Sequence, residues 1–190
     1  MDLTTTYLRL KLRTPLVPSA SPLSEKIENI RKMEEAGAAA VVFHSLFEEQ
    51  IEETAPECRV DPKQYLEHIA EAKRKVGIPI IASLNCTTLG AWLSYARRIS
   101  DAGADALELN IYKIPTRTEV TGSAIEKGYI DTVRSVRAAT NIPLAVKLGP
   151  YFSNFANMAV CLDDLGFAGL ALFTRFFQPD IAPLKIAAVP

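Results

Sequence analysis

The stretches PLVPSAS (15–21), PIIASLN (79–85) and PLAVKLG (143–149) are three versions of one pattern, in which a proline opens a short apolar run that ends in small or polar residues. The prolines are 64 residues apart in both intervals. A stretch closing on a glycine follows each version, and then a second apolar run begins, as AAAVVFHS (38–45), ADALELNIY (104–112) and AGLALFTRF (168–176). A fixed period of this length indicates a repeated supersecondary unit.

Each unit predicts a strand, a helix and a second strand, with another helix leading to the next unit. Nearly continuous apolar runs are typical of parallel strands covered on both faces. The fold class is therefore α/β, a TIM (β/α)8-type barrel with only about six βα units. The expected strands are 16–20, 39–43, 78–84, 106–111, 144–148 and 169–173.

Four copies of the pattern are needed for eight strands, and a fourth proline at the same spacing would fall at about position 207. We therefore expect residues 1–190 to form one domain that lacks the last two βα units. Such an arc leaves its first and sixth strands as open edges, which predicts a homo-oligomer formed through those edges.

Helices are expected between the strands, at 24–37, 62–77, 88–103, 128–141 and 154–166. Ser24 could cap the first of them, and Asp61 before Pro62 could cap the second. Glycines at 37, 103 and 166 are placed to end three of these helices. The alternating TTYLRLKLR (5–13) predicts a small strand or hairpin at the bottom of the barrel.

Composition is ordinary for a soluble domain, with 48% hydrophobic residues, 23% charged residues and a net charge of -1. Neither nucleic acid nor an anionic membrane is favoured as a partner by that charge. Three cysteines without CxxC spacing fit a reducing compartment, and no signal-like or membrane-spanning run is evident, so a cytoplasmic location is expected. No metal site is expected.

The carboxyl ends of the strands are where parallel barrels place their chemistry. Asn110 and Lys147 are the notable residues there, because each interrupts an apolar strand and a buried amide or ammonium needs a partner. A bound polar ligand would supply that partner. The alternative is structural: Lys147 pairs with Glu108 inside the barrel, and Asn110 caps a strand end.

Several stretches resemble the flavin-dependent dihydroorotate and dihydropyrimidine dehydrogenases, in particular the dihydroorotate dehydrogenase-like branch. The resemblance covers PLVPSASPLS (15–24), AAAVVFHSLFEEQ (38–50), ADALELNIYKIPT (104–116), PLAVKLGPYFSN (143–154) and LFTRFFQPDI (172–181). It implies FMN across the top of a (β/α)8 barrel and hydride transfer between the flavin N5 atom and a dihydropyrimidine. It also implies a role in pyrimidine metabolism.

Residue by residue, the resemblance implies flavin contacts from the backbone of Ala20 and Ser21 and from Asn110, Lys147 and Ser45. Asn110 would also contact the substrate. Lys147 would lie beside N1 and the C2 carbonyl, where a cation stabilises the negative charge of the reduced ring.

Other positions depart from the family pattern. Lys113 lies about where those enzymes carry a cysteine or serine base, which makes it a weak candidate for the catalytic base. His44 stands at the place of a flavin-contacting lysine, where it could bond to a flavin carbonyl or cap a strand. Thr174 replaces an asparagine that holds the pyrimidine, and Asn85 is a further candidate substrate contact.

Two features expected of such an enzyme, a long substrate-covering loop and a glycine-rich phosphate-binding loop, are not found in this sequence. The segment 48–64 is short for a substrate-covering lid, and no GG or GxG stands ready to bind phosphate. The hypotheses are therefore an FMN-dependent oxidoreductase, or a non-catalytic degenerate or truncated barrel that needs a partner. A weaker one is a Schiff-base aldolase using Lys147.

Overall fold

The computed structural model describes residues 1–48, 62–86, 88–113, 115–174, 180–182 and 187–189. Asp61, Cys58 and most of the segment 48–64 lie outside these residues, so their expected roles are not addressed. The elements that build the domain are β1 (Thr5–Tyr7), β2 (Leu10–Leu12), the 3-10 helix η1 (Pro22–Glu25), α1 (Ile27–Glu35), β3 (Val41–Phe47), α3 (Pro62–Lys75), β4 (Ile80–Asn85), α4 (Leu89–Asp101), β5 (Ala106–Ile111), α5 (Gly122–Ala139), β6 (Leu144–Leu148), α6 (Phe155–Asp164) and β7 (Gly169–Leu172). Two short strands, β8 (Asp180–Ala182) and β9 (Ala187–Val189), pair antiparallel.

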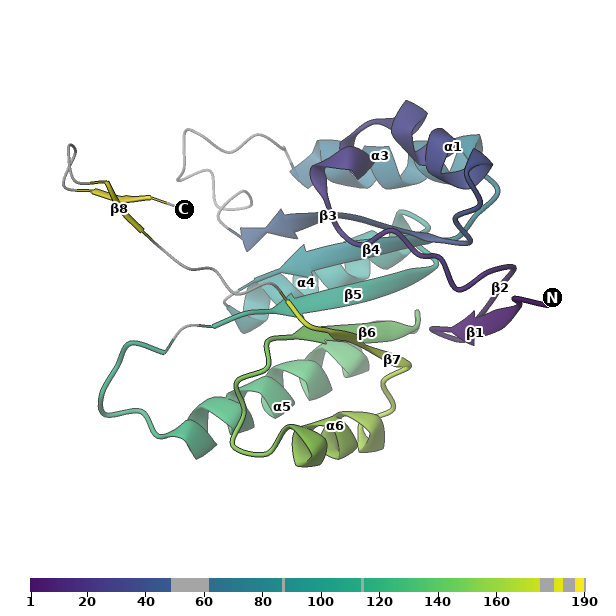
Figure 1. Ribbon diagram of the computed structural model, residues 1–190. Coiled ribbons are helices and arrows are strands. Elements are labelled where there is room, and N and C mark those ends of the chain that lie inside the picture. Colours follow the sequence, from purple (N-terminus) through teal and green to yellow (C-terminus); the bar gives the residue numbers. More distant parts are fainter. Residues whose placement is uncertain (49–61, 87, 114, 175–179, 183–186, 190) are drawn as a thin grey trace.

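A parallel sheet of five strands in the order β3-β4-β5-β6-β7 forms the centre of the domain. All five agree with expected strands, and β5 and β6 have the expected bounds. The helices lie along one face of the sheet, and the β1–β2 hairpin lies at the end where the strands begin (Figure 1). The architecture is that of an incomplete TIM-type barrel, with the helices on the outer face.

The expected strand 16–20 is not a strand in the structure. The segment still lies beside β3, because Ala39 N donates to Leu16 O and Val42 N donates to Pro18 O, both at 2.9 Å. Pro18 has no N–H with which to return a hydrogen bond, and Pro15 opens the run with the same deficit. The segment therefore accepts from β3 without forming a ladder, and the first unit of the repeat differs from the other two.

Helix ends follow the sequence in some places and differ in others. Gly37, Gly103 and Gly166 adopt positive φ angles of 103°, 92° and 79°, as expected of residues that end helices. Ser24 is not a helix cap, since α1 begins after Lys26 and no side chain caps it. α5 begins at Gly122, earlier than expected, because Thr121 Oγ1 accepts from Ala124 N and supplies a cap.

The expected N-terminal strand is confirmed as the β1–β2 hairpin, whose turn residues Leu8 and Arg9 have positive φ. Leu8 and Leu12 are buried against inner-face residues of the sheet, among them Val42, Ala106 and Ala145. The outer face packs against the helices in a second, larger core that includes Phe43, Ile80, Leu107 and Val146. The hairpin therefore covers apolar inner-face surface that the helices leave open.

Gly169, the first residue of β7, makes room for this hairpin. A Cβ atom there would lie 2.9 Å from Tyr7 Cε2 and 3.0 Å from Leu8 Cδ2. Because both side chains would have to move, we expect Gly169→Ala to destabilise the protein by about 1–2 kcal/mol in urea unfolding. Gly128→Ala is the control, since a Cβ there meets nothing within 4 Å and alanine favours the helix interior. Equal stability of the two variants would contradict the close packing of the hairpin.

Candidate functional site

Polar side chains gather on the inner face of the sheet towards the carboxyl ends of its strands. In the sheet register, Ser45, Ser83 and Glu108 lie at one level on β3, β4 and β5. Asn110 on β5 and Lys147 on β6 are direct partners one level higher. Side chains at one level of neighbouring strands point to the same face. The sheet thus brings together three of the predicted site residues, Ser45, Asn110 and Lys147.

Glu108 and Lys147 form a buried ion pair across β5 and β6. Lys147 Nζ lies 3.5 Å from Glu108 Oε1, and the two side chains are 17% and 3% exposed. Burial raises the pKa of Glu108, and the Lys147 charge opposes this shift in part. The structural alternative for Lys147 is therefore present in the molecule. The pair is long, and Glu108 Oε1 has no hydrogen-bond partner, so Lys147 acts on it mainly as a charge.

A hydroxyl pair continues this polar layer toward β3. Ser45 Oγ and Ser83 Oγ lie 2.8 Å apart. Ser83 is fully buried. The register between β3 and β4 shifts between Val42 and Ser45, so the N–H and C=O groups of Ser83 are not paired with β3 in a regular ladder. The hydroxyl of Tyr65 on α3 pairs with these groups instead: it accepts from Ser83 N and donates to Ser83 O, each at 3.0 Å.

Asn110 is held by a side chain from beyond β7. Thr174 Oγ1 donates to Asn110 Oδ1 at 3.1 Å, and Thr174 N donates to Leu148 O at 2.8 Å. These two residues are 64 positions apart, the period of the sequence repeat. The bond orients the Asn110 amide so that its oxygen is occupied, which leaves the NH2 group as the donor that Asn110 can offer a ligand.

His44 does not face the inner surface. The irregularity in β3 turns its ring toward the helices, where it lies 5.1 Å from the Tyr65 ring and 6.0 Å from the His68 ring, centroid to centroid. Its backbone N donates to Ser24 Oγ, and Ser24 O contacts His68 Nε2. A bond from His44 to a flavin carbonyl is one of two alternatives, and the bulge aims the side chain away from the inner face, where Asn110 and Lys147 lie.

Neither ring nitrogen of His44 has a hydrogen-bond partner, and the residue is 8% exposed. Burial lowers its pKa, aided by His68 and opposed by Glu25. Because the unfolded chain binds a proton at His44 more readily than the folded protein does, the free energy of unfolding is highest above the pKa of a free histidine. It falls as the pH drops below about 6.5. We expect His44→Phe to flatten the loss of unfolding free energy between about pH 7.5 and 5, measured in urea. A slope as steep as that of the unsubstituted protein would contradict this assignment.

The remaining predicted residues lie around this cluster. Ala20 and Ser21 are half-buried and lead into η1, where Ser21 O accepts from both Ser24 N and Ser24 Oγ. Asn85 is half-buried at the end of β4. Lys113 follows β5 and is exposed to solvent.

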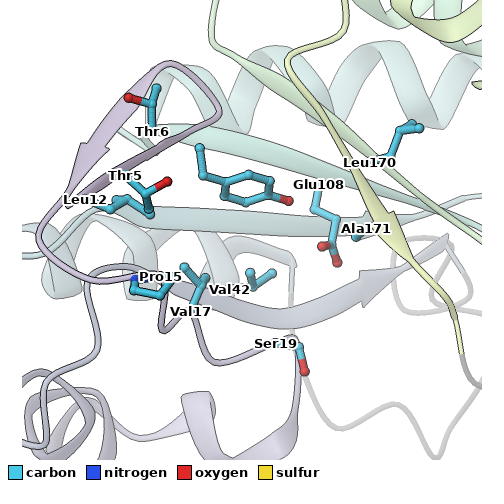
Figure 2. Close-up of a pocket in the computed structure, with 11 residues that line it drawn as sticks. Thr5, Thr6, Leu12, Pro15, Val17, Ser19, Val42, Glu108, Leu170 and Ala171 are labelled. Atoms are coloured by element: carbon cyan, nitrogen blue, oxygen red, sulfur yellow. The ribbon is translucent and has the colours of Figure 1, made fainter. Parts of the chain in front are cut away.

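A cavity of about 400 Å³ opens on the inner face below this cluster, and the sequence did not reveal it. It is lined by the hairpin, by residues 15–19, by β3 and by β7, with Glu108 as its buried charged group. Figure 2 shows the Glu108 carboxyl group pointing into the cavity between Val42 and Ala171. Tyr7 also lines it, and burial together with the Glu108 charge raises the pKa of Tyr7 to about 12.

Within the described ranges, no helix is both long enough and apolar enough to cross a membrane. No family model matches the chain.

Curated proteins of similar sequence are dihydroorotate dehydrogenases. The catalytic subunit of the NAD(+)-linked B enzyme of Thermoplasma acidophilum is 26% identical over 178 residues, which cover 83% of this chain and 58% of that protein. The same subunit from Endomicrobium trichonymphae is 22% identical over 133 residues, covering 65% and 43%. That of Anoxybacillus flavithermus is 31% identical over 98 residues, covering 50% and 31%. The chain thus spans about half the length of the first two relatives and less of the third.

Solved structures of similar fold include dihydrodipicolinate synthases. The enzyme of Acinetobacter baumannii has a TM-score of 0.56 at 20% identity, with 82% of this chain and 53% of that chain covered. The Agrobacterium tumefaciens enzyme has a TM-score of 0.56 at 17% identity, covering 82% and 51%. At these identities the likeness concerns the fold. The chain is therefore similar in sequence to dihydroorotate dehydrogenases and has the fold of an incomplete TIM-type barrel.

Proposed function

We propose that this chain is the ring-binding part of an FMN-dependent oxidoreductase that acts on a dihydropyrimidine-like substrate. The observation that carries the proposal is the direct pairing of Asn110 and Lys147 on the inner face, at the carboxyl ends of β5 and β6. The sequence similarity to dihydroorotate dehydrogenases supports the same chemistry. Residues 1–190 would act as one domain of this kind.

The donor set fits the isoalloxazine ring. The Asn110 amide offers N–H donors because Thr174 occupies its oxygen, and Lys147 offers a cation that is 17% exposed. Ring carbonyl oxygens and the N1 edge accept such donors. The backbone of Ala20 and Ser21 and the hydroxyl of Ser45 would complete the ring contacts, while Asn85 and Thr174 would face the substrate.

When bound, FMN would supply the acceptor for a hydride taken from the substrate. The role of Lys147 would be to stabilise the negative charge that develops at the N1 edge, and that of Asn110 to fix the ring and the substrate relative to each other. Glu108 holds the Lys147 ammonium at the right level of the sheet. Lys113, exposed to solvent after β5, would be the candidate for the proton-accepting base.

The proposal is tested by FMN binding to the purified chain, measured by quenching of flavin fluorescence. We expect saturable binding, and we expect Asn110→Ala to weaken it about tenfold, since a hydrogen bond contributes about 1 kcal/mol or somewhat more. Asn141→Ala, at an exposed position before β6, is the matched control. Failure of the unsubstituted chain to bind added FMN would overturn the proposal for this chain.

Schiff-base chemistry at Lys147 is the second candidate, and the barrel strand position of this lysine favours it. The ion pair with Glu108 at 3.5 Å weighs against it, because a paired ammonium group has no lone pair with which to attack a carbonyl carbon. Borohydride trapping with pyruvate as the probe distinguishes the two. A covalent adduct on Lys147, found by mass spectrometry, would favour the aldolase.

A non-catalytic role through association is a third reading, favoured by the edge of the sheet. Within the described residues β7 pairs with β6 alone, and Leu172 and Phe173 are 50% and 51% exposed. An edge with apolar side chains is suited to pairing with another chain. A dimer in solution together with no FMN binding would favour this role over the oxidoreductase.

A further inference from the structure

Glu108 lies between two different environments on the inner face. Toward the carboxyl ends of the strands it faces Lys147, which is a direct partner of Asn110 in the sheet. Toward the hairpin it lines the cavity. Neither Lys147 nor Asn110 is among the residues that line that cavity. A ligand over Lys147 and Asn110 would therefore leave Glu108 accessible from the opposite side.

The carboxyl group is held in a way that leaves it ready to accept a proton. Glu108 is 3% exposed and its Oε1 atom has no hydrogen-bond partner. The groups that act on it come from four elements: Lys147 on β6, Ser83 on β4, Tyr7 on β1 and Tyr65 on α3. Lys147 is the one positive charge among these groups. Lys147 and the Ser83 hydroxyl both favour the anionic form of Glu108, and Lys147 has the larger effect, so withdrawal of the ammonium removes most of this support.

The cavity gives this carboxyl group its own access to water. Its volume of about 400 Å³ exceeds the roughly 30 Å³ that one water molecule occupies in the liquid several times over. A polar wall at Glu108, Tyr7 and Ser19 offers such water hydrogen-bond partners. Protons can thus reach Glu108 without passing the ligand side of Lys147.

We propose that Glu108 is a proton acceptor coupled to Lys147. When negative charge develops on a ligand bound above Lys147, the ammonium moves toward that charge and away from Glu108, and Glu108 takes up one proton from solvent by way of the cavity water. When the charge on the ligand disappears, Lys147 returns and Glu108 releases the proton to the cavity. The net charge of the Lys147–Glu108 pair and the ligand is therefore kept constant. Reduction of the ligand is accompanied by one extra proton, bound by Glu108, in addition to any proton that the ligand itself binds.

The inference rests on the proposed FMN site for its ligand, and two separate measurements test it. In the first, the midpoint potential of bound FMN is measured against pH between about pH 7.5 and 9, above the ordinary pKa of a carboxyl group. We expect a slope up to twofold steeper in the unsubstituted protein than in Glu108→Gln, because the slope counts the protons taken up per electron. Glu67→Gln, at an exposed position on α3, is the control and should keep the steep slope. Equal slopes in Glu108→Gln and the unsubstituted protein would overturn the inference.

The second measurement needs no flavin. Lys147→Met reproduces permanently the withdrawal of the ammonium, so we expect the infrared C=O stretch of a protonated carboxylic acid at neutral pH. This band should disappear in Glu108→Gln/Lys147→Met. Absence of the band in Lys147→Met would overturn the inference, whether or not FMN binds. Absence of FMN binding with the band present would instead overturn the proposed function and leave the coupling supported.

Discussion

Lys147→Met is expected to lower the free energy of unfolding by about 3 kcal/mol at pH 7. Removal of the ammonium leaves Glu108, which is 3% exposed, as a buried charge without a counter-charge. Protonation of Glu108 limits the loss, because about 1.4 kcal/mol is needed for each pH unit between the ordinary pKa of a glutamic acid and the working pH. Urea unfolding measures the difference.

The loss of stability in Lys147→Met should depend on pH. Burial raises the pKa of Glu108 in the folded state, and loss of Lys147 raises it further, because Lys147 is the largest influence that lowers it. The stability of the variant is then fully present below the ordinary pKa of about 4.5 and is lost as pH rises through the folded value. The gap between Lys147→Met and the unsubstituted protein should close as pH falls from 7 to about 4.5.

Two further variants separate the buried pair from a general effect of losing a lysine. Glu108→Gln/Lys147→Met removes both charges and should recover most of the loss. Lys127→Met breaks a solvent-exposed pair with Asp131 on α5 and should change stability little. If Lys127→Met and Lys147→Met lower the free energy of unfolding equally, the buried Glu108–Lys147 pair contributes no more to stability than a solvent-exposed pair.

Tyr65→Phe is expected to cost about 3 kcal/mol, an unusually large effect for the loss of one hydroxyl group. The hydroxyl is fully buried and satisfies both the N–H and the C=O of Ser83. Its removal leaves two buried backbone groups unpaired, and each unsatisfied group costs about 1–3 kcal/mol. Chemical unfolding of the variant measures the loss.

Tyr95→Phe is the matched control for this change. The Tyr95 hydroxyl accepts from Arg98 Nη1, and Arg98 is exposed to solvent, so its guanidinium group can bind water once this partner is lost. We expect a loss below about 1 kcal/mol. A Tyr65→Phe variant as stable as Tyr95→Phe would show that the β3–β4 irregularity does not depend on this hydroxyl.

The repeat pattern in the sequence predicted most of the fold. Apolar runs ending at polar residues predicted the five strands of the sheet, and the glycines at 37, 103 and 166 predicted three helix ends. These features are local, so a sequence shows them directly. The strand expected at 16–20 failed for a local reason as well, because Pro18 cannot donate to a ladder.

The site was predictable only in part. Asn110 and Lys147 could be found because polar residues within apolar strands are conspicuous. The orientation of His44 could not be found, because one shift in register between Val42 and Ser45 decides which face it points to. Tyr65 fitted the apolar face of its helix, and its bond to Ser83 depends on that same shift. The cavity depends on side chains from five segments, the hairpin, residues 15–19, β3, β5 and β7, and no local pattern reports such a combination.

The hydrogen bond between Thr174 and Asn110 also indicates how strongly the sheet is curved. It joins the end of β5 to the residues after β7, with β6 between them. In a flat sheet such strands lie about 9.5 Å apart, which is two strand spacings. The inner face must therefore be strongly concave for the side chains to meet. Small residues at Ala145, Gly169 and Ala171 permit this curvature, so barrel-like bending is a local property of these strands and does not require a closed ring.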